Sequence, residues 1–441
     1  MLSRTALQSR PSSRTLLARV LETPELPTQI QALPGPVLGK LIDHVGLEDA
    51  AELVALATTE QLAQIFDEDL WHSARPGEDE RFDADRFLLW LQIMLEAGER
   101  FVAERLAELP QDLVTLAFQR HLLVLSEDAL RAELTAGDDE AEGAEKAFES
   151  CLSEEIDEYQ LIWRGGDGWD DVLSALLAFD RDHHSLCQDV LERCAQLSQE
   201  YIEDNGGLYE VLSSDQMLEN DLAAERESRR AERGYVAPSA AAAFLRLARR
   251  PLANVAVPPE RDALTRAYFR ELARSPAAPA TTTPPSRRQD LARLLEVSGI
   301  TRDAATPPLL VSGDRGREMP LLMSALQRLA TDAPAAFSER SEELAYLSNV
   351  LVAGAAIDGR RLRPLEAVEH AIAAVSFGLW LVAGEPSPSA ETAARHLAQQ
   401  PCDALLRLAF AKAAAPALRV KPKSPAKDLA RVRALLKAMK Q

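Results

Sequence analysis

Apolar positions between residues 20 and 135 recur at three- and four-residue spacing, which predicts a series of short helices. The stripe that follows Pro34 shows this spacing most clearly: Val37, Leu38, Leu41, Ile42 and Val45. Thr58 and Gln61 have the spacing of a capping box for a later helix, and Asp83 is the expected N-cap of the next one. Because helices this short are marginally stable alone, we expect them to stack as a solenoid-like array.

Helical periodicity continues through the rest of the chain. We expect a helix over residues 145–163 and another that begins near Asp180, with one apolar stripe formed by Cys187, Val190, Leu191, Cys194, Leu197 and Tyr201. No run of Val, Ile, Tyr or Thr alternates with polar residues, so the sequence gives no confident strand. The expected fold class is therefore all-α.

Breaks in this pattern suggest the domain boundaries. The loop at 136–143 and the Pro- and Thr-rich linker at 275–287 separate three expected domains: a helical array (20–135), an acidic helical domain (144–274) and a C-terminal helical domain (288–415). Residues 1–19 have several arginines and no acid, as in a transit peptide or a disordered basic arm, and we expect the arm. Residues 416–441 form a basic tail, and we expect both ends to be mobile.

Composition narrows the class of protein. The 441 residues include only 4 cysteines, too few for a disulfide framework, which favours reduced thiols in the cytoplasm. The longest uncharged apolar run, Ala371 to Ala383, is shorter than a membrane span and predicts a buried core helix.

Charge is distributed unevenly along the chain. Residues 136–225 hold 25 Asp and Glu against 4 Lys and Arg, whereas residues 419–441 hold 8 Lys and Arg against one Asp. The acidic segment would repel nucleic acid. It is either a solvated helix face or a docking surface for a basic partner, including the chain's own tail.

The basic tail has the pattern of an amphipathic helix. Its apolar face would contain Leu429, Val432, Leu435, Leu436 and Met439, with Arg431, Arg433, Lys437 and Lys440 around it. One hypothesis is that these basic residues contact region 136–225 of the same chain or a neighbour. The alternatives are an anionic membrane surface, a docking partner or a disordered tail.

Common catalytic motifs are absent: the sequence has no GxGxxG, GxxxxGK[ST], GxSxG or HExxH. One group of metal-ligand residue types is close in sequence: Asp180, His183, His184, Cys187 and Cys194. The two cysteines fall on the apolar stripe, so core packing is the favoured interpretation and metal binding the alternative. Arg360, Arg361 and Arg363 form a basic knot, either an anion site before the helix at Pro364 or a surface loop.

Three stretches resemble an uncharacterised bacterial family known only as a domain of unknown function. They are LPGPVLGKLIDHVGLEDAAELVALATTEQLAQIFDEDLW (33–71), ERESRRAERGYVAP (225–238) and EELAYLSNVLVAGAAIDGRRLRPLEAVEHA (342–371). The first also resembles, more distantly, the cytoplasmic helical domain of MgtE-type magnesium transporters. These resemblances imply a helical fold and no catalytic residues.

Together these features favour a non-enzymatic interaction or scaffold protein with no cofactor and an unidentified protein partner. A divalent-cation-responsive regulatory module is the first alternative, because of the acidic segment and the transporter resemblance. A metal-dependent enzyme that uses the His183 region is the second.

Overall fold

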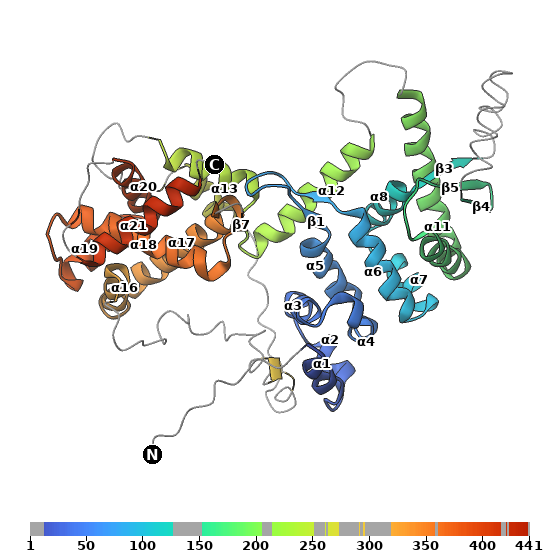
Figure 1. Ribbon diagram of the computed structural model, residues 1–441, viewed down its shortest axis with the longest axis horizontal. Coiled ribbons are helices and arrows are strands. Elements are labelled where there is room, and N and C mark those ends of the chain that lie inside the picture. Colours follow the sequence, from blue (N-terminus) through green and yellow to red (C-terminus); the bar gives the residue numbers. More distant parts are fainter. Residues whose placement is uncertain are drawn as a thin grey trace. The chain divides into compact units, whose positions relative to one another are not determined.

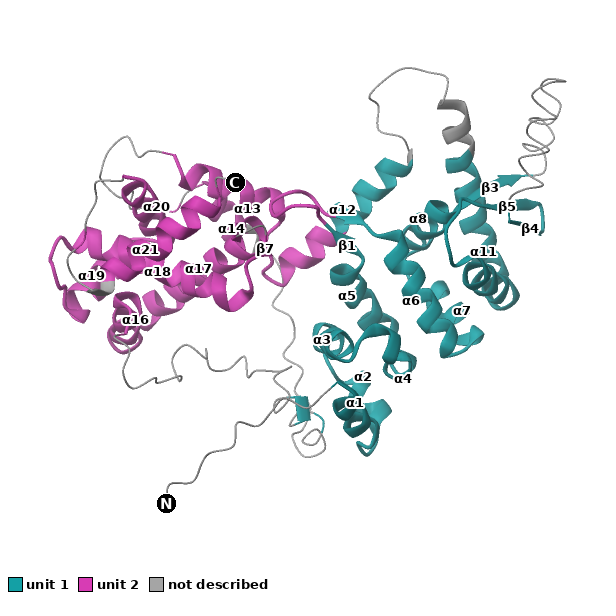
Figure 2. Cartoon of the chain, viewed as in Figure 1, with its two compact units in different colours: residues 1–72, 81–225, 281–311 teal, residues 73–80, 226–280, 312–441 magenta. Residues whose placement is uncertain are grey.

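The computed structural model describes residues 13–126, 152–204, 214–250, 261, 263–272, 291, 294–295, 319–357, 360–415, 420 and 423–439. The fold is all-α with a few short strands, as predicted. The chain divides into two compact units, and neither is one continuous segment (Figure 2). Unit 1 contains residues 1–72, 81–225 and 281–311, and unit 2 contains residues 73–80, 226–280 and 312–441. This division differs from the three consecutive domains expected from the linkers.

Unit 1 begins with the predicted series of short helices (Figure 1). They are α1 (Ser13–Leu21), α2 (Leu26–Gln31), α3 (Gly35–Val45), the 3-10 turn η1 (Leu47–Asp49), α4 (Ala51–Ala55), α5 (Thr59–Asp69), α6 (Ala84–Glu96), α7 (Glu99–Glu108) and α8 (Gln111–His121). The short strands β1 (Trp71–His72) and β2 (Arg81–Phe82) pair between α5 and α6.

Local capping fixes where these helices start. The predicted capping box is present at α5, where the Thr58 hydroxyl accepts from the Gln61 amide and the Gln61 side chain returns to the Thr58 amide. Asp83 caps α6, also as predicted, by accepting from the Arg86 amide. Edge-to-face aromatic contacts, such as that between Phe66 and Trp90 at 5.2 Å, then fill the core between neighbouring helices.

A three-stranded antiparallel sheet follows α8, and it corrects the helix expected over residues 145–163 from residue 153 on. Residues 145–151 of that prediction lie outside the described residues. The strands are β3 (Leu122–Ser126), β4 (Ser153–Ile156) and β5 (Tyr159–Trp163), with β5 in the middle. Val124 pairs with Leu161, so the sheet depends on partners that are distant in sequence. Local periodicity does not contain that pairing, which is why the strands were missed.

The long helix α11 (Trp169–Asp204) packs against α7 and α8. It is continuous through Asp180 but bends at His183, whose φ of −140° and ψ of 48° are not helical. The second helical segment therefore begins at His183, three residues after the start expected at Asp180. Beyond it, Cys187, Val190, Leu191 and Cys194 are buried, which confirms this part of the predicted apolar stripe. Leu197 is partly buried, and the side chain of Tyr201 lies outside the described part of the chain.

Unit 2 consists mainly of helices that pack on one another. Helix α12 (Ser214–Glu232) belongs to unit 1 up to residue 225 and to unit 2 from residue 226. The other elements of unit 2 are α13 (Pro238–Ala248), α14 (Ala263–Leu272), α16 (Leu321–Asp332), α17 (Pro334–Gly354), β6 (Ala356–Ile357), β7 (Arg360–Arg361), α18 (Pro364–Ala383), α19 (Ala390–Gln399), α20 (Cys402–Ala413) and α21 (Lys423–Ala438).

Helix α18 is the core element of unit 2. It packs against α17, α20 and α21, and every residue from Ala371 to Leu379 is buried. Gly378 permits the close approach to α20, because a Cβ at that position would lie 2.2 Å from the Leu405 carbonyl oxygen. Among the described helices, α18 is long and apolar enough to cross a membrane, and here it forms the interior of unit 2.

The described parts of the two segments that we expected to be mobile are helical, and residues 1–12, 416–419, 421–422 and 440–441 lie outside the described residues. Residues 13–21 form α1, with Leu16 and Val20 buried in unit 1. Residues 423–438 form α21, and its predicted apolar residues Leu429, Val432, Leu435 and Leu436 are buried in unit 2. The apolar face is therefore an anchor to the core, which explains why this basic segment is folded.

Candidate functional site

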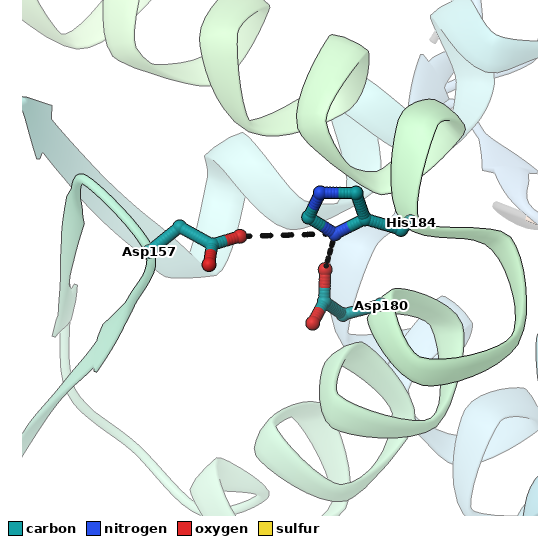
Figure 3. A group of neighbouring side chains, drawn as sticks. All are labelled: Asp157, Asp180 and His184. Carbon is teal, nitrogen blue, oxygen red and sulfur yellow. Dashed lines mark hydrogen bonds and ion pairs between the residues drawn. The ribbon is translucent and has the colours of Figure 1, made fainter.

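Three potential metal ligands converge beside the kink of α11 (Figure 3). Asp180 and His184 come from the helix, and Asp157 comes from the turn between β4 and β5. One ligand atom from each side chain lies within 4.8 Å of the other two. The sequence analysis had included Asp180 and His184 and had missed Asp157, because the turn reaches the helix only through the tertiary fold.

Unusual backbone conformations accompany two parts of this site. Asp157 has a φ of 50°, which is a left-handed conformation that aspartate tolerates better than most residues. The non-helical residue His183 separates Asp180 from His184. The turn and the kink together bring carboxylates from two elements to one imidazole.

The imidazole of His184 faces both carboxylates through the same nitrogen. Nδ1 lies 2.8 Å from Asp180 Oδ1 and 3.8 Å from Asp157 Oδ2. The hydrogen bond with Asp180, and then the charges of both carboxylates, raise the pKa of His184 above its usual value. Gln188 also donates a hydrogen bond to Asp157. This arrangement favours a positive charge, and either a proton or a metal ion can supply it.

The thiols of Cys187 and Cys194 on α11 are buried in the core of unit 1, as the favoured interpretation predicted. Burial raises the pKa values of Cys187 and Cys194 to about 12. Neither thiol belongs to the group of three potential ligands. His183 is directed toward the ring of Phe179, with centroids 6.2 Å apart, and is not one of the three grouped ligands.

Comparison with known proteins gives one match, to a family of unknown function, DUF6178, whose model matches residues 3–421. The chain belongs to this family. No curated protein and no solved structure matches it. The DUF6178 match contains all three stretches that carried the resemblance, and the likeness to magnesium transporters stays a prediction.

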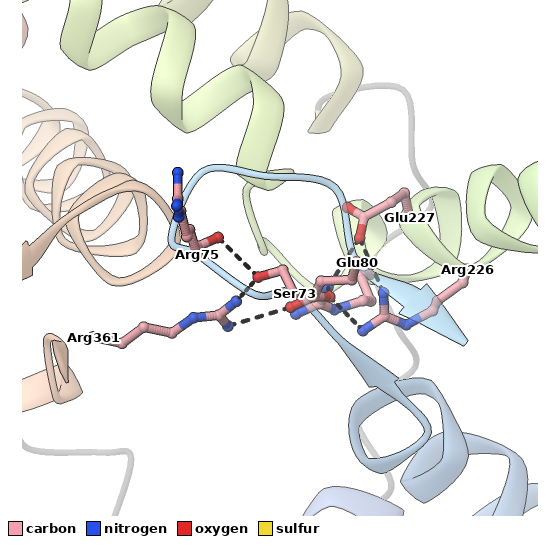
Figure 4. A network of polar contacts seen from close by, with 7 residues as sticks. Ser73, Arg75, Glu80, Arg226, Glu227 and Arg361 are labelled. Atoms are coloured by element: carbon pink, nitrogen blue, oxygen red, sulfur yellow. Dashed lines mark hydrogen bonds and ion pairs between the residues drawn. The ribbon is translucent and has the colours of Figure 1, made fainter. Parts of the chain in front are cut away.

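Two of these DUF6178 stretches meet in unit 2 around Glu80 (Figure 4). The Glu80 carboxylate lies 2.8 Å from Arg226, 3.0 Å from Arg230 and 3.4 Å from Arg361, and its side chain is only 8% exposed. Burial alone would raise the pKa of Glu80, but these guanidinium groups lower it below the usual value. We interpret this network as the anchor of segment 73–80 in unit 2.

The sequence analysis missed Glu80 because nothing near it in sequence marks it as a partner. A usable signal was the four-residue spacing of Arg226 and Arg230, which puts both side chains on one face of a helix.

The basic knot, Arg360, Arg361 and Arg363, is paired with a carboxylate from the same chain. Arg360 binds Glu366 at 2.8 Å, and the amide of Arg363 donates to the same carboxylate at 2.9 Å. These contacts lower the pKa of Glu366 to about 2. Glu366 thus occupies the position at the start of α18 that an external anion would take, and the anion site stays the alternative to a surface loop.

The candidate interaction residues of the tail lie on α21 in unit 2. Arg431 pairs with Glu369 at 3.3 Å, and Arg433 donates to the carbonyls of Ala413 and Ala415. Lys437 is exposed, and Lys440 lies outside the described residues. The contact with region 136–225 stays a hypothesis, since these neighbours all belong to unit 2.

Proposed function

We propose that this DUF6178 protein is a divalent-cation-responsive regulatory module that binds a transition-metal ion through Asp157, Asp180 and His184. The observation that supports it best is the convergence of these three ligand atoms from two separate elements. Such a site requires the folded unit, so ion binding there is coupled to tertiary structure.

The geometry suits a small divalent ion. Zinc binds imidazole and carboxylate at about 2.0–2.2 Å, so two ligands in a tetrahedral shell lie about 3.3–3.5 Å apart. The observed separations from His184 Nδ1, 2.8 Å and 3.8 Å, bracket that value. Small rotations of two partly exposed carboxylates would therefore complete a coordination shell, with water at the open positions.

The donor set also selects the class of ion. Imidazole suits zinc and other first-row transition metals, whereas Mg²⁺ and Ca²⁺ prefer sites made only of oxygen. The excess of acidic residues over 136–225 would raise the local concentration of any cation. Selectivity therefore comes from His184 and attraction from the surrounding charge.

Isothermal titration calorimetry of the full chain with Zn²⁺, Mn²⁺, Mg²⁺ and Ca²⁺ tests the proposal. We expect saturable binding of one Zn²⁺ or Mn²⁺, and at least tenfold weaker binding after Asp180→Ala. The matched control is Asp189→Ala, which removes an exposed aspartate from the same helix and should leave affinity unchanged. If none of the ions gives saturable heat, or if both variants weaken binding equally, the proposal is wrong.

A non-enzymatic interaction protein is the second candidate, and the surface of α11 favours it. Leu177 is 49% exposed and lies on the face of α11 that also carries Trp169 and Leu173. Co-purification from a native lysate tests this role. A specific partner should be lost with Leu177→Ser and kept with the control Leu365→Ser, whose leucine in unit 2 is equally exposed. Equal recovery with both variants would contradict it.

A further inference from the structure

We infer that a metal ion bound by Asp157, Asp180 and His184 fastens the β4–β5 hairpin to α11, so that the hairpin responds to metal loading. This inference rests on the proposed function. Its structural basis is the distribution of the ligands: the helix supplies two, and the hairpin turn supplies the third. An ion held by all three must join the two elements.

The hairpin has one well-anchored strand and one weakly anchored strand. In β5, Tyr159, Leu161 and Trp163 are buried, and this strand pairs with both neighbours. In β4, Ile156 is buried, whereas residues 153–155 are exposed. Strand β4 is the outer strand of the described sheet. A metal ion bound at the turn would therefore hold the hairpin where its other contacts are weakest.

Charge makes the metal-free hairpin easier to displace. Residues 153–163 contain four acids, Glu154, Glu155, Asp157 and Glu158, and no Lys or Arg. The turn faces Asp180 on a helix that is itself rich in acids. The carboxylates of Asp157 and Asp180 have oxygens within 4.8 Å of each other, and their like charges destabilise the contact whenever His184 is neutral. A divalent cation between the carboxylates would convert this repulsion into attraction.

The existing polar contacts are a weak substitute for coordination bonds. Asp157 is held to α11 by the 3.8 Å ion pair with His184 and by a hydrogen bond from Gln188. The side chains of Asp157 and His184 are 49% and 63% exposed, and ion pairs this exposed contribute little to stability.

Hydrogen-exchange mass spectrometry of the full chain, with and without saturating Zn²⁺, tests the inference alongside the calorimetry. Zn²⁺ should slow amide exchange over residues 153–163 by about tenfold or more, and leave α16 and α19 in unit 2 unchanged. Asp157→Asn keeps a residue that tolerates the turn conformation but removes the charged ligand, so it should abolish the slowing. Glu155→Gln removes one negative charge from the same hairpin and should preserve the slowing by Zn²⁺.

The outcomes separate the inference from the proposed function. If Zn²⁺ binds in calorimetry and hairpin exchange does not change, the fastening role is wrong and the metal site remains. If Asp157→Asn and Glu155→Gln respond alike, general charge reduction explains the effect and the inference is wrong. If Zn²⁺ does not bind, both are wrong.

Discussion

In unit 1 the carboxylates of Asp157 and Asp180 stand at the surface beside one imidazole, whereas in unit 2 the carboxylate of Glu343 is buried between two arginines. Glu343 is 1% exposed and also accepts the amide hydrogen of Cys402 at the start of α20. The difference lies in what neutralises the charge. The buried Glu343 is neutralised by arginines of unit 2, so its charge serves stability, whereas Asp157 and Asp180 in unit 1 remain accessible to an external ion.

The largest expected effect comes from removing the buried carboxylate. Glu343→Gln would remove the buried anion that Arg340 and Arg261 share inside unit 2. It would leave these two arginines the half-exposed Glu339. Breaking a buried pair in this way costs about 3–5 kcal/mol. Hydrogen exchange in increasing urea should show that α17 and α20 lose protection at lower urea, while α7 in unit 1 is unchanged.

The neighbouring residue supplies the control. Glu342 is exposed, so Glu342→Gln should change the free energy of unfolding by less than about 0.5 kcal/mol. Equal effects of the two variants would show that the buried network does not stabilise unit 2.

A smaller effect is expected at Glu80, because one of its partners is partly exposed. Arg361 is 42% exposed, so part of the network is screened by water. Glu80→Gln should destabilise unit 2 by about 2 kcal/mol at pH 7. Glu78→Gln, at an exposed position of the same segment, is the matched control.

The pH dependence of this variant has a definite sign. The arginines lower the pKa of Glu80 in the folded state, so its stabilisation is present above the unfolded pKa of about 4.5 and is lost as pH falls below it. The difference between wild type and Glu80→Gln should therefore shrink between pH 5 and pH 3. A constant difference would mean that the carboxylate charge is not what anchors the segment.

The raised pKa of Asp428 predicts that unit 2 depends on pH with the opposite sign from the Glu80 effect. Burial raises the pKa of Asp428 to about 7, although Arg431 and Lys427 oppose the shift. The folded state therefore binds the proton more tightly, and unit 2 should lose stability as pH rises from about 4 to about 7. Asp428→Asn should stabilise unit 2 clearly at pH 8 and by almost nothing at pH 4. Equal urea midpoints for the two proteins at pH 8 would contradict this.

The sequence predicted what depends on local chemistry. The capping box at Thr58, the apolar stripe that contains Cys187 and the amphipathic face of α21 all follow from residues within two turns of one another. The β5 strand and the ligand Asp157 depend on contacts across tens of residues, and periodicity does not encode them. Two of the three candidate ligands, Asp180 and His184, were accordingly visible in the sequence.

Asp157 gives the smallest predicted change in stability and the sharpest test of what this residue does. Its left-handed backbone costs an L-residue about 1 kcal/mol that glycine avoids, so Asp157→Gly should stabilise the metal-free hairpin by about 0.5–1 kcal/mol. The same change removes a ligand. Wild type should gain about 2.7 kcal/mol at a Zn²⁺ concentration of 100 times Kd, and the variant should gain almost nothing. Without Zn²⁺, amide exchange in the hairpin should therefore be slower in the variant than in wild type. With Zn²⁺, it should be faster in the variant. If the order stays the same in both conditions, Asp157 serves the turn alone and the metal site loses its third ligand.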